Sequence, residues 1–216
     1  MDPRRSERLR TAPQAEPPDT GDRAKLERRR QILAAAKAVF ADSGYHGASI
    51  NAIIERAQIA RGTFYLYFES KSAVFDSILD QALADLRARI HRIDVETPGA
   101  PAPQAALRDQ VISTLEYIIS DRALAMLLLS AGHTPDAEAA ERLDQFYSEV
   151  RDLLMRALEA GMEIGLLRPC HPEIVSAAML GLIRGVIELV VRQGEQAKVE
   201  DVVNELLMVA LRGVLK

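Results

Sequence analysis

The fold of this chain is decided by a short stretch, residues 57–71, which reads AQIARGTFYLYFESK. Directly before it, apolar residues recur at helical spacing from Ile50 to Ala57 and predict a short helix, for which Ser49 is a fitting N-cap. Within the stretch, the pattern predicts a second short helix from about Ala60 to Tyr67. Two short helices that close with a preceding helix into a small core are the requirement of a helix-turn-helix, whose second helix enters a DNA major groove. The stretch therefore predicts a DNA-binding unit.

Helical periodicity continues on both sides of this stretch. A first helix is predicted from about Ala24 to Ser43, ended by Gly44, and a long fourth helix is predicted to reach about Ile93. After the Pro- and Gly-rich break at residues 97–103, further helices are expected near 104–119, 121–132, 136–162, 172–193 and 198–214. We therefore expect an all-α fold of about nine helices, with an N-terminal three-helix helix-turn-helix domain over 24–71 and a larger helical bundle over 72–216. Residues 1–23, which hold four prolines among charges, are expected to form a disordered tail.

Composition and charge support this division. Apolar residues make up 48% of the chain and aromatic residues 5%, with no Trp, so an aliphatic core of helices is favoured over a β-sandwich. The net charge of −4 is unevenly distributed, because residues 24–71 carry eight Lys and Arg against four acids, whereas residues 72–216 carry fourteen against twenty-two. A small basic module on an acidic body suggests a DNA-binding protein, although many enzymes carry similar basic patches.

Motifs for catalysis are missing from the sequence. The four histidines show neither HExxH spacing nor cysteine partners in zinc register, and there is no Walker loop, dinucleotide-binding GxGxxG or nucleophile elbow. The single cysteine, Cys170, lies beside His171 in a Pro-bounded turn and is expected to be structural. No signal peptide and no uninterrupted apolar run of about 18 residues is found. We therefore expect a cytoplasmic protein that is not an enzyme, holds no cofactor or metal and has no membrane partner.

The run Gly-Thr-Phe-Tyr-x-Tyr-Phe-x-x-Lys at residues 62–71, with the preceding stretch from Phe40 to Ile54, resembles the DNA-binding motif of TetR-family transcription regulators. The likeness covers residues 24–71, and the rest of the chain is similar only in length and helical layout. The resemblance implies a regulator, most simply a repressor, that binds double-stranded palindromic operator DNA as a homodimer and is released by a small effector. Two positions depart from the family pattern: Gln58 stands where a turn Gly is frequent, and Ala60 stands where a Ser or Thr cap is frequent.

Eight residues are candidates for DNA contact. Arg61 is the best candidate for reading a base edge, Gly62 would allow close approach to the duplex, and Thr63 would reach a base or a thymine methyl group. The other side chains are expected to contact phosphates, which position a protein without reading sequence. For any single tyrosine or lysine of the set, a half-buried or solvated structural role is the alternative. The candidates are Tyr45, Ser49, Arg61, Gly62, Thr63, Tyr65, Tyr67 and Lys71.

The resemblance also implies an effector pocket among the fourth to eighth helices. An aliphatic and Met-rich lining favours a hydrophobic effector, such as a fatty acyl chain, a lipid-like compound or a drug. The alternative is that the same residues form ordinary core. Arg184 is a further polar candidate, although an i,i+4 ion pair with Glu188 is the simpler expectation. The candidate lining residues are Leu115, Tyr117, Ile118, Arg122, Met126, Leu127, Leu129, His133, Phe146, Tyr147, Val150, Leu154, Met155 and Leu158.

The last two helices are candidates for a dimer interface. Residues 174–191 are apolar on nearly all sides, more than one intramolecular face requires, and Gly181 and Gly185 would allow close helix approach. Two such helices from each subunit would form a four-helix interface, whereas the alternative is a helix central to the monomer. The candidate interface residues are Met179, Leu182, Ile183, Val186, Ile187, Val190, Val203, Leu206, Leu207 and Ala210.

Three functional classes stay open at this point. The first is the ligand-responsive repressor, and the second is a DNA-binding protein with the same motif but no effector. The third is a helical-bundle enzyme or lipid carrier in which residues 24–71 are merely structural. Tight, salt-dependent binding to a palindrome would exclude the third class.

Overall fold

The computed structural model describes residues 20–130, 136–193 and 199–214, and every regular element within these ranges is an α-helix. This confirms the all-α prediction. Of the predicted disordered tail, residues 1–19 lie outside the described residues, whereas the last four, 20–23, belong to the first helix. The helices are α1 (Thr20–Gly47), α2 (Ile50–Ala57), α3 (Arg61–Tyr65), α4 (Lys71–Arg89), α5 (Pro103–Ser120), α6 (Arg122–Leu129), α7 (Ala137–Glu163), α8 (Pro172–Gln193) and α9 (Val199–Val214).

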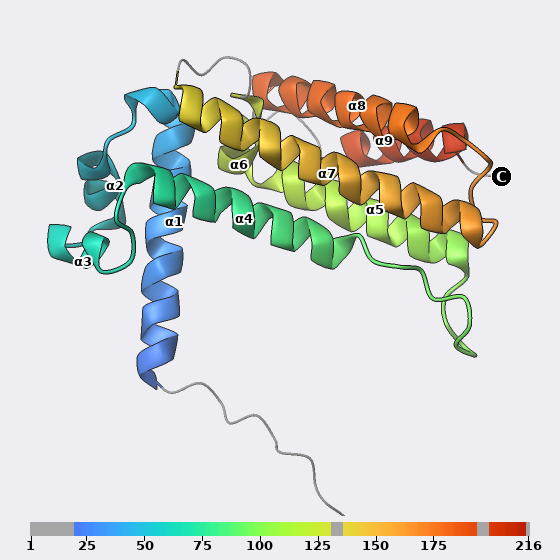
Figure 1. The fold of residues 1–216 in the computed structure, drawn as a ribbon, viewed down its shortest axis with the longest axis horizontal. Helices are drawn as coiled ribbons and strands as arrows, with labels where there is room; N and C mark the ends of the chain where they lie inside the picture. Colours follow the sequence, from blue (N-terminus) through green and yellow to red (C-terminus); the bar gives the residue numbers. More distant parts are fainter. Residues whose placement is uncertain (1–19, 131–135, 194–198, 215–216) are drawn as a thin grey trace, which may run out of the picture.

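The first three helices form a small unit at one end of the molecule (Figure 1). Its core is built around Ile32, Ile53 and Phe64, none of which is exposed to solvent. Gly44 has φ +67°, a left-handed backbone, and interrupts α1 before one last turn that ends at Gly47. The predicted break at Gly44 is thus confirmed, although the helical turn beyond it is an addition to the prediction.

The two short helices begin and end as their caps dictate. The Ser49 side chain accepts a hydrogen bond of 3.1 Å from the Ala52 backbone N–H, which confirms Ser49 as the N-cap of α2. Gln58 ends α2 with φ +52°, the one non-glycine residue of the described chain with positive φ. Ala60 precedes α3 and provides no side-chain cap. The two departures from the family pattern therefore cost backbone strain and one capping bond without preventing the turn.

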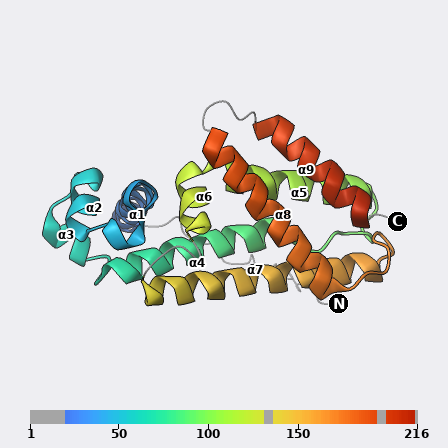
Figure 2. The same cartoon turned by 90° about the horizontal axis from the view of Figure 1, so that it is seen from above.

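The remaining helices form a bundle that extends away from this unit. α4 lies beside α7, α8 crosses over α7, and α9 lies along α5 (Figures 1 and 2). α6 packs between α1 and α8 and joins the helix-turn-helix unit to the bundle. The N-terminal halves of α4 and α7 are tied by Arg142, which forms ion pairs with Asp76, at 3.2 Å, and with Asp80.

Two details of the bundle differ from the sequence predictions. α4 ends at Arg89 rather than near Ile93, because Ile90 closes the helix and the chain turns away. The predicted Arg184–Glu188 ion pair is wrong: the Arg184 guanidinium lies 4.6 Å from the centre of the Tyr147 ring, and Glu188 pairs with Arg192. Arg184 is thus oriented toward α7, and Glu188 toward the end of its own helix.

One helix of the described chain, α8, is long and apolar enough to cross a membrane by length and composition alone. Its mean hydropathy over 18 residues is 2.1, although Arg184 and Glu188 lie within it and no uninterrupted apolar run reaches that length. Few of its residues are buried inside the subunit. An apolar helix that is mostly unburied within its own chain exposes apolar surface to water. Contact with a second protein chain would cover that surface, as contact with lipid would.

Candidate DNA-binding surface and effector cleft

Helix α3 presents three consecutive residues at the outer end of the molecule. Arg61 and Gly62 are exposed, Thr63 is half-buried, and Phe64 behind them is fully buried. Phe64 anchors the helix in the core, so its N-terminal face is held outward. The Arg61 guanidinium lies 5.8 Å from the centre of the Tyr65 ring, a cation–π contact that leaves its N–H groups free for a further partner.

Gly62 is not required by packing within the subunit. A Cβ atom built on it meets no other atom within 4 Å, and its φ is not in the left-handed region. Packing and backbone conformation within the described residues therefore do not account for a glycine at this position. This placement supports the expectation that another molecule approaches the backbone closely here.

Tyr45 does not lie on this surface. Its ring is buried, 6% exposed, and it contacts the rings of Phe40 at 5.5 Å and Phe75 at 4.7 Å. Burial, followed by the acidic residues nearby, raises the pKa of Tyr45 to about 12. The expected phosphate contact by Tyr45 is therefore wrong, because the aromatic ring belongs to the joint between α1 and α4.

Lys71 also has intramolecular partners that the sequence did not suggest. Its ammonium donates hydrogen bonds to the carbonyl oxygens of Tyr45, at 2.7 Å, and Ala48, at 3.2 Å, and lies 4.2 Å from the centre of the Tyr45 ring. These carbonyls end α1, and a cation there satisfies them and complements the helix dipole. The structure thus places the Lys71 charge at the joint between α1, α2 and α4 rather than extended toward a phosphate.

The other predicted contacts are accessible to different degrees. Tyr65 is 45% exposed, Tyr67 is half-buried against the core, and Ser49 is exposed while its oxygen caps α2.

Sequence reasoning missed Leu66, which is 82% exposed. Because Phe64 and Phe68 are buried, a residue two positions from each points to the opposite side of the turn, and this spacing would have predicted Leu66 as an outward apolar contact.

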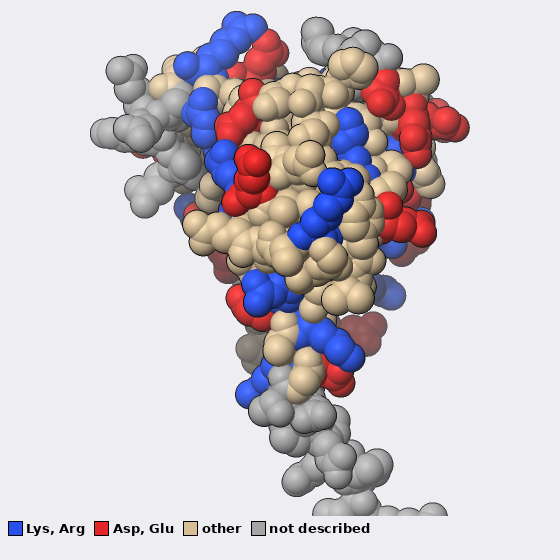
Figure 3. Space-filling view, turned by 90° about the vertical axis from the view of Figure 1, so that its left-hand side faces the viewer, with Lys and Arg blue, Asp and Glu red and all other residues tan. Residues whose placement is uncertain are grey.

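The basic excess of residues 24–71 does not form one continuous patch. The face that carries this unit shows Lys and Arg interspersed with Asp and Glu, with several basic residues toward the start of α1 (Figure 3). Several cations of the excess are already paired: Arg56 with Asp42 at 2.9 Å, and Lys37 with Asp121 of the bundle. The net charge of residues 24–71 therefore overstates the positive charge that is available to DNA. Arg61, which is exposed, then accounts for a larger share of that available charge.

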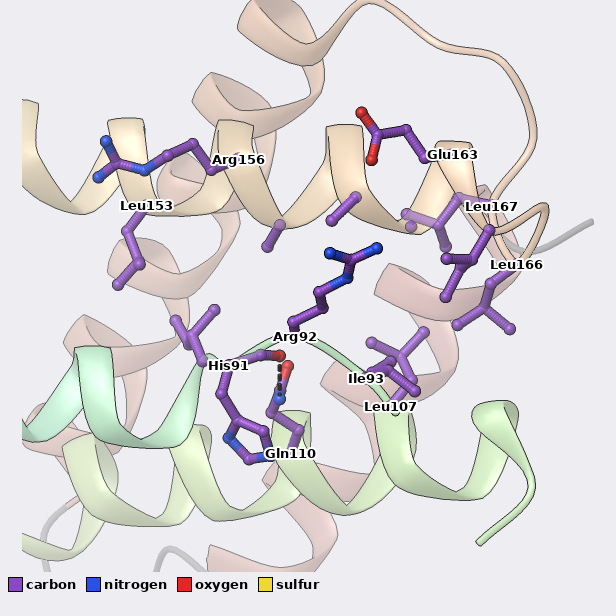
Figure 4. Close-up of a pocket in the computed structure, with 15 residues that line it drawn as sticks. His91, Arg92, Ile93, Leu107, Gln110, Leu153, Arg156, Glu163, Leu166 and Leu167 are labelled. Carbon is purple, nitrogen blue, oxygen red and sulfur yellow. Dashed lines mark hydrogen bonds between the residues drawn. The ribbon is translucent and has the colours of Figure 1, made fainter. Parts of the chain in front are cut away.

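The bundle contains a cleft formed by two adjoining cavities between α5, α7 and the end of α4. The cavity nearer α8, called the inner cavity below, has a volume of about 100 Å³, is apolar and is lined mainly by aliphatic side chains of α5, α7 and α8. The outer cavity, about 330 Å³, opens between the segment after α4 and the last turns of α7 (Figure 4). The two share Ile90, Leu107, Gln110, Ala157 and Leu167 as lining residues, so they adjoin at these side chains, and we treat them as two parts of one cleft.

Three of the predicted pocket residues, Leu115, Leu154 and Leu158, line the inner cavity. Four others are buried in the core and line neither cavity: Ile118, Leu127, Phe146 and Val150. The rest of the predicted set line neither part of the cleft: Tyr117, Arg122, Met126, Leu129, Tyr147 and Met155.

Hydrogen bonds explain two of these exclusions. The Tyr117 hydroxyl donates to Asp85 at 3.0 Å, and the Tyr147 hydroxyl donates to the Leu128 carbonyl at 2.8 Å, so both rings are fixed elsewhere in the bundle. His133 lies outside the described residues. Helical periodicity identifies inward positions but cannot tell a filled core from a cleft further along the same helices.

The predicted dimer-interface set is also divided by the structure. Four residues are buried within the subunit, and for them the prediction is wrong: Ile187, Val203, Leu206 and Leu207. Leu182, Val186 and Val190 are half-buried between α5, α8 and α9, whereas Met179 and Ile183 line the inner cavity of the cleft. The side chain of Ala210 lies outside the described residues.

A different face of α8 and α9 is apolar and exposed. Ile174 is 67% exposed and Val209 57%, and Leu189 and Met208 are also exposed. Gly181 and Gly185 lie on the outer side of α8, with nothing within 4 Å of a Cβ built on either. The exposed apolar face therefore passes through the two glycines rather than through the bulkier residues that the sequence suggested.

Known proteins similar to this chain are bacterial regulators. The family model for bacterial regulatory proteins of the tetR family matches residues 32–78, and a model for a tetracyclin repressor-like C-terminal domain matches residues 100–214. The HTH-type transcriptional repressor KstR2 of Rhodococcus jostii is 28% identical over 199 residues, which cover 92% of this chain and 96% of that protein.

Two solved structures share the fold. A complex of SmeT, the repressor of a Stenotrophomonas maltophilia multidrug efflux pump, with triclosan has a TM-score of 0.71 at 22% identity, covering 88% of this chain and 92% of that one. The transcriptional regulator FadR of Bacillus subtilis, in complex with stearoyl-CoA, has a TM-score of 0.69 at 20% identity, covering 85% and 98%. The arrangement of α1–α3 and the bundle is thus the fold of these two regulators.

Proposed function

Since the chain belongs to the TetR family of bacterial transcription regulators, we propose that it is a cytoplasmic repressor that binds a palindromic operator as a homodimer and is released by a small, largely apolar effector. The observation that carries the proposal is the combination of an outward α3 with a cleft in the bundle. Arg61 and Gly62 are exposed on a helix anchored by Phe64, and the cleft lies at the far end of α4. Residues 24–71 would bind DNA and residues 72–216 would bind effector and partner.

The exposed apolar face of α8 and α9 supports the dimer. Ile174, Leu189 and Val209 are large apolar residues in water, and Gly181 and Gly185 let a facing helix approach closely. Two such faces related by a two-fold axis would form a four-helix interface. A two-fold dimer presents two copies of α3 to two half-sites, which is what a palindrome requires.

Helix α4 connects the two functions. Its first residue, Lys71, is bonded to the end of α1, and Ile90, directly after its last turn, lines both cavities of the cleft. An effector that moves Ile90 would therefore move the joint that positions α2 and α3. By linkage, an effector that weakens operator binding must bind the DNA-bound protein more weakly by the same factor.

DNA binding tests the proposal. The full-length protein is used to select its operator from random duplexes, and affinities for that operator and for a scrambled duplex are measured by fluorescence anisotropy at several salt concentrations. Arg61→Ala is expected to relax specificity at one position of each half-site, at a cost of about 1–3 kcal/mol on the operator. Tyr65→Phe is expected to weaken operator and scrambled duplex alike.

The matched control is Arg151→Ala, an exposed arginine of α7 that lines neither part of the cleft. It should leave both affinities unchanged. If Arg61→Ala lowers both affinities equally, the residue contacts the DNA backbone and its assigned role is wrong. If no duplex is bound in a salt-dependent manner, the repressor proposal itself fails.

A further inference from the structure

The two parts of the cleft differ in chemistry. The inner part is lined by aliphatic side chains and Met179, with Gln110 and Thr114 as its polar residues. Both of these are already bonded: the Thr114 hydroxyl donates to the Gln110 carbonyl at 2.8 Å, and the Gln110 amide donates to the His91 carbonyl at 2.8 Å. The inner part therefore offers contact to an apolar group and little polar recognition.

The outer part carries more basic than acidic groups. Its lining includes His91, Arg92 and Arg156 against one acid, Glu163. Arg92 extends from the segment after α4 toward α7, where Arg156 and Glu163 lie on either side of it (Figure 4). Within the described ranges, neither arginine forms a hydrogen bond or an ion pair, so both guanidinium groups are available to a ligand at the mouth of the apolar cleft.

From this arrangement we propose that the effector is an amphiphile with an apolar chain and an anionic head, and that Arg92 and Arg156 bind the head. The inference rests on the proposed function and specifies the ligand of its cleft. Guanidinium groups bind carboxylates and phosphates by charge-assisted hydrogen bonds, which are stronger than neutral ones. A cationic head would meet like charge here, and an uncharged head would gain no charge-assisted hydrogen bond from either arginine, since both are exposed and hydrated without it.

The same arrangement links the ligand to α4. Ile90 and Arg92 lie within three residues of the end of α4, and Ile90 lines both the inner and the outer part of the cleft. The chain of the bound amphiphile would contact Ile90 while its head contacts Arg92. Both contacts act on the end of α4, which is the helix that leads to the DNA-binding unit.

Calorimetric titration of the full-length protein tests the proposal with ligands of one chain length. The probes are dodecanoate, dodecanoyl-CoA, dodecanol and dodecyltrimethylammonium, each kept below its micelle concentration. An anionic probe is expected to bind at least about tenfold more tightly than dodecanol, which is the loss expected for one charge-assisted hydrogen bond. Dodecyltrimethylammonium should bind more weakly still. Preference between the carboxylate and the coenzyme A ester then identifies a carboxylate or a phosphate as the head.

Two double variants separate head recognition from general charge. Arg92→Gln with Arg156→Gln should reduce anion affinity to that of dodecanol. Arg108→Gln with Arg151→Gln, exposed arginines of α5 and α7 that do not line the cleft, should leave the preference intact. Circular dichroism and a melting curve check that both variants fold.

A third variant tests the location. Ala157→Phe, at a residue that lines both cavities, should abolish binding of all four probes. Equal affinity for dodecanoate, dodecanoyl-CoA and dodecanol overturns the anionic head and leaves the effector cleft standing. Anion binding that survives Ala157→Phe, or no binding of any probe, overturns the inference. The proposed function fails separately, if no compound that binds the protein changes its operator affinity.

Discussion

Removing the Lys71 ammonium should destabilise the protein rather than merely weaken DNA binding. Lys71→Met keeps most of the side chain that covers the Tyr45 ring and deletes the donor to the Tyr45 and Ala48 carbonyls. A hydrogen bond from a charged group contributes about 1.5–3 kcal/mol, and the cation–π contact about 0.5–1 kcal/mol when partly exposed. Because Lys71 is half-buried and water can replace part of the loss, we expect a decrease of about 2–4 kcal/mol in the free energy of unfolding.

Urea unfolding followed by circular dichroism measures this change. Protein concentration is held constant, because the stability of the proposed dimer would depend on it. The midpoint should fall without a change in slope. Lys25→Met is the matched control: its ammonium is 3.9 Å from Asp22, both side chains are largely exposed, and the change should be within about 0.5 kcal/mol of zero.

The competing interpretation, that Lys71 contacts a phosphate, makes the opposite prediction. In that case Lys71→Met unfolds like the unaltered protein, and the slope of log affinity against log salt falls by about one. That pair of results would refute the assignment of Lys71 to the α1–α4 joint. A loss of stability with an unchanged salt slope would support it.

Three further predictions concern single positions. Gln58→Gly should raise the free energy of unfolding by about 0.5–1 kcal/mol in urea unfolding, because the φ of +52° is strained for Gln and not for Gly. Gly161→Ala should lower it by about 1–3 kcal/mol, since the added Cβ would lie 2.6 Å from the Leu167 Cδ1; a change near zero would mean that Leu167 moves aside freely. The pKa of Tyr45 is raised from 10.0 to about 12, so its contribution to stability is complete below pH 10 and is lost as pH rises to about 12. Urea midpoints measured across that range should fall less steeply for Tyr45→Phe, and an unchanged dependence on pH would contradict the assignment.

The sequence predicted the fold because local signals agree with the tertiary structure. Ser49 caps α2, Gly44 breaks α1, and the positions of Phe64 and Phe68 set the inward side of α3 and the turn after it. Each of these signals acts within a few residues, where the spacing in the chain fixes the spacing in space. Boundaries were less accurate, as at the end of α4, because a helix end without a strong cap depends on tertiary contacts.

The sites were predicted less well because their residues are distant in sequence. Tyr45 and Lys71 are 26 positions apart, and only the packing of α1 against α4 brings the ammonium onto the ring. The head-binding candidates Arg92 and Arg156 come from a loop and from α7. Neither residue shows a periodic or motif signal in the sequence. The function of a charged residue can therefore be assigned only when the fold shows which carbonyl groups, aromatic rings and cavities lie beside it.

The Lys71 joint and the effector cleft lie at opposite ends of α4. Lys71 fixes the first turn of α4 to the end of α1, and Tyr117 and Arg142 bond its other turns to α5 and α7 through Asp85, Asp76 and Asp80. An α-helix is a rigid element, and rigid elements can carry a displacement from one end to the other. A ligand that displaces Ile90 would therefore be felt at Lys71 without any contact to DNA. The stability of the Lys71 joint consequently sets how much of that displacement reaches α3, and Lys71→Met should reduce release by effector even where the variant still folds and binds operator.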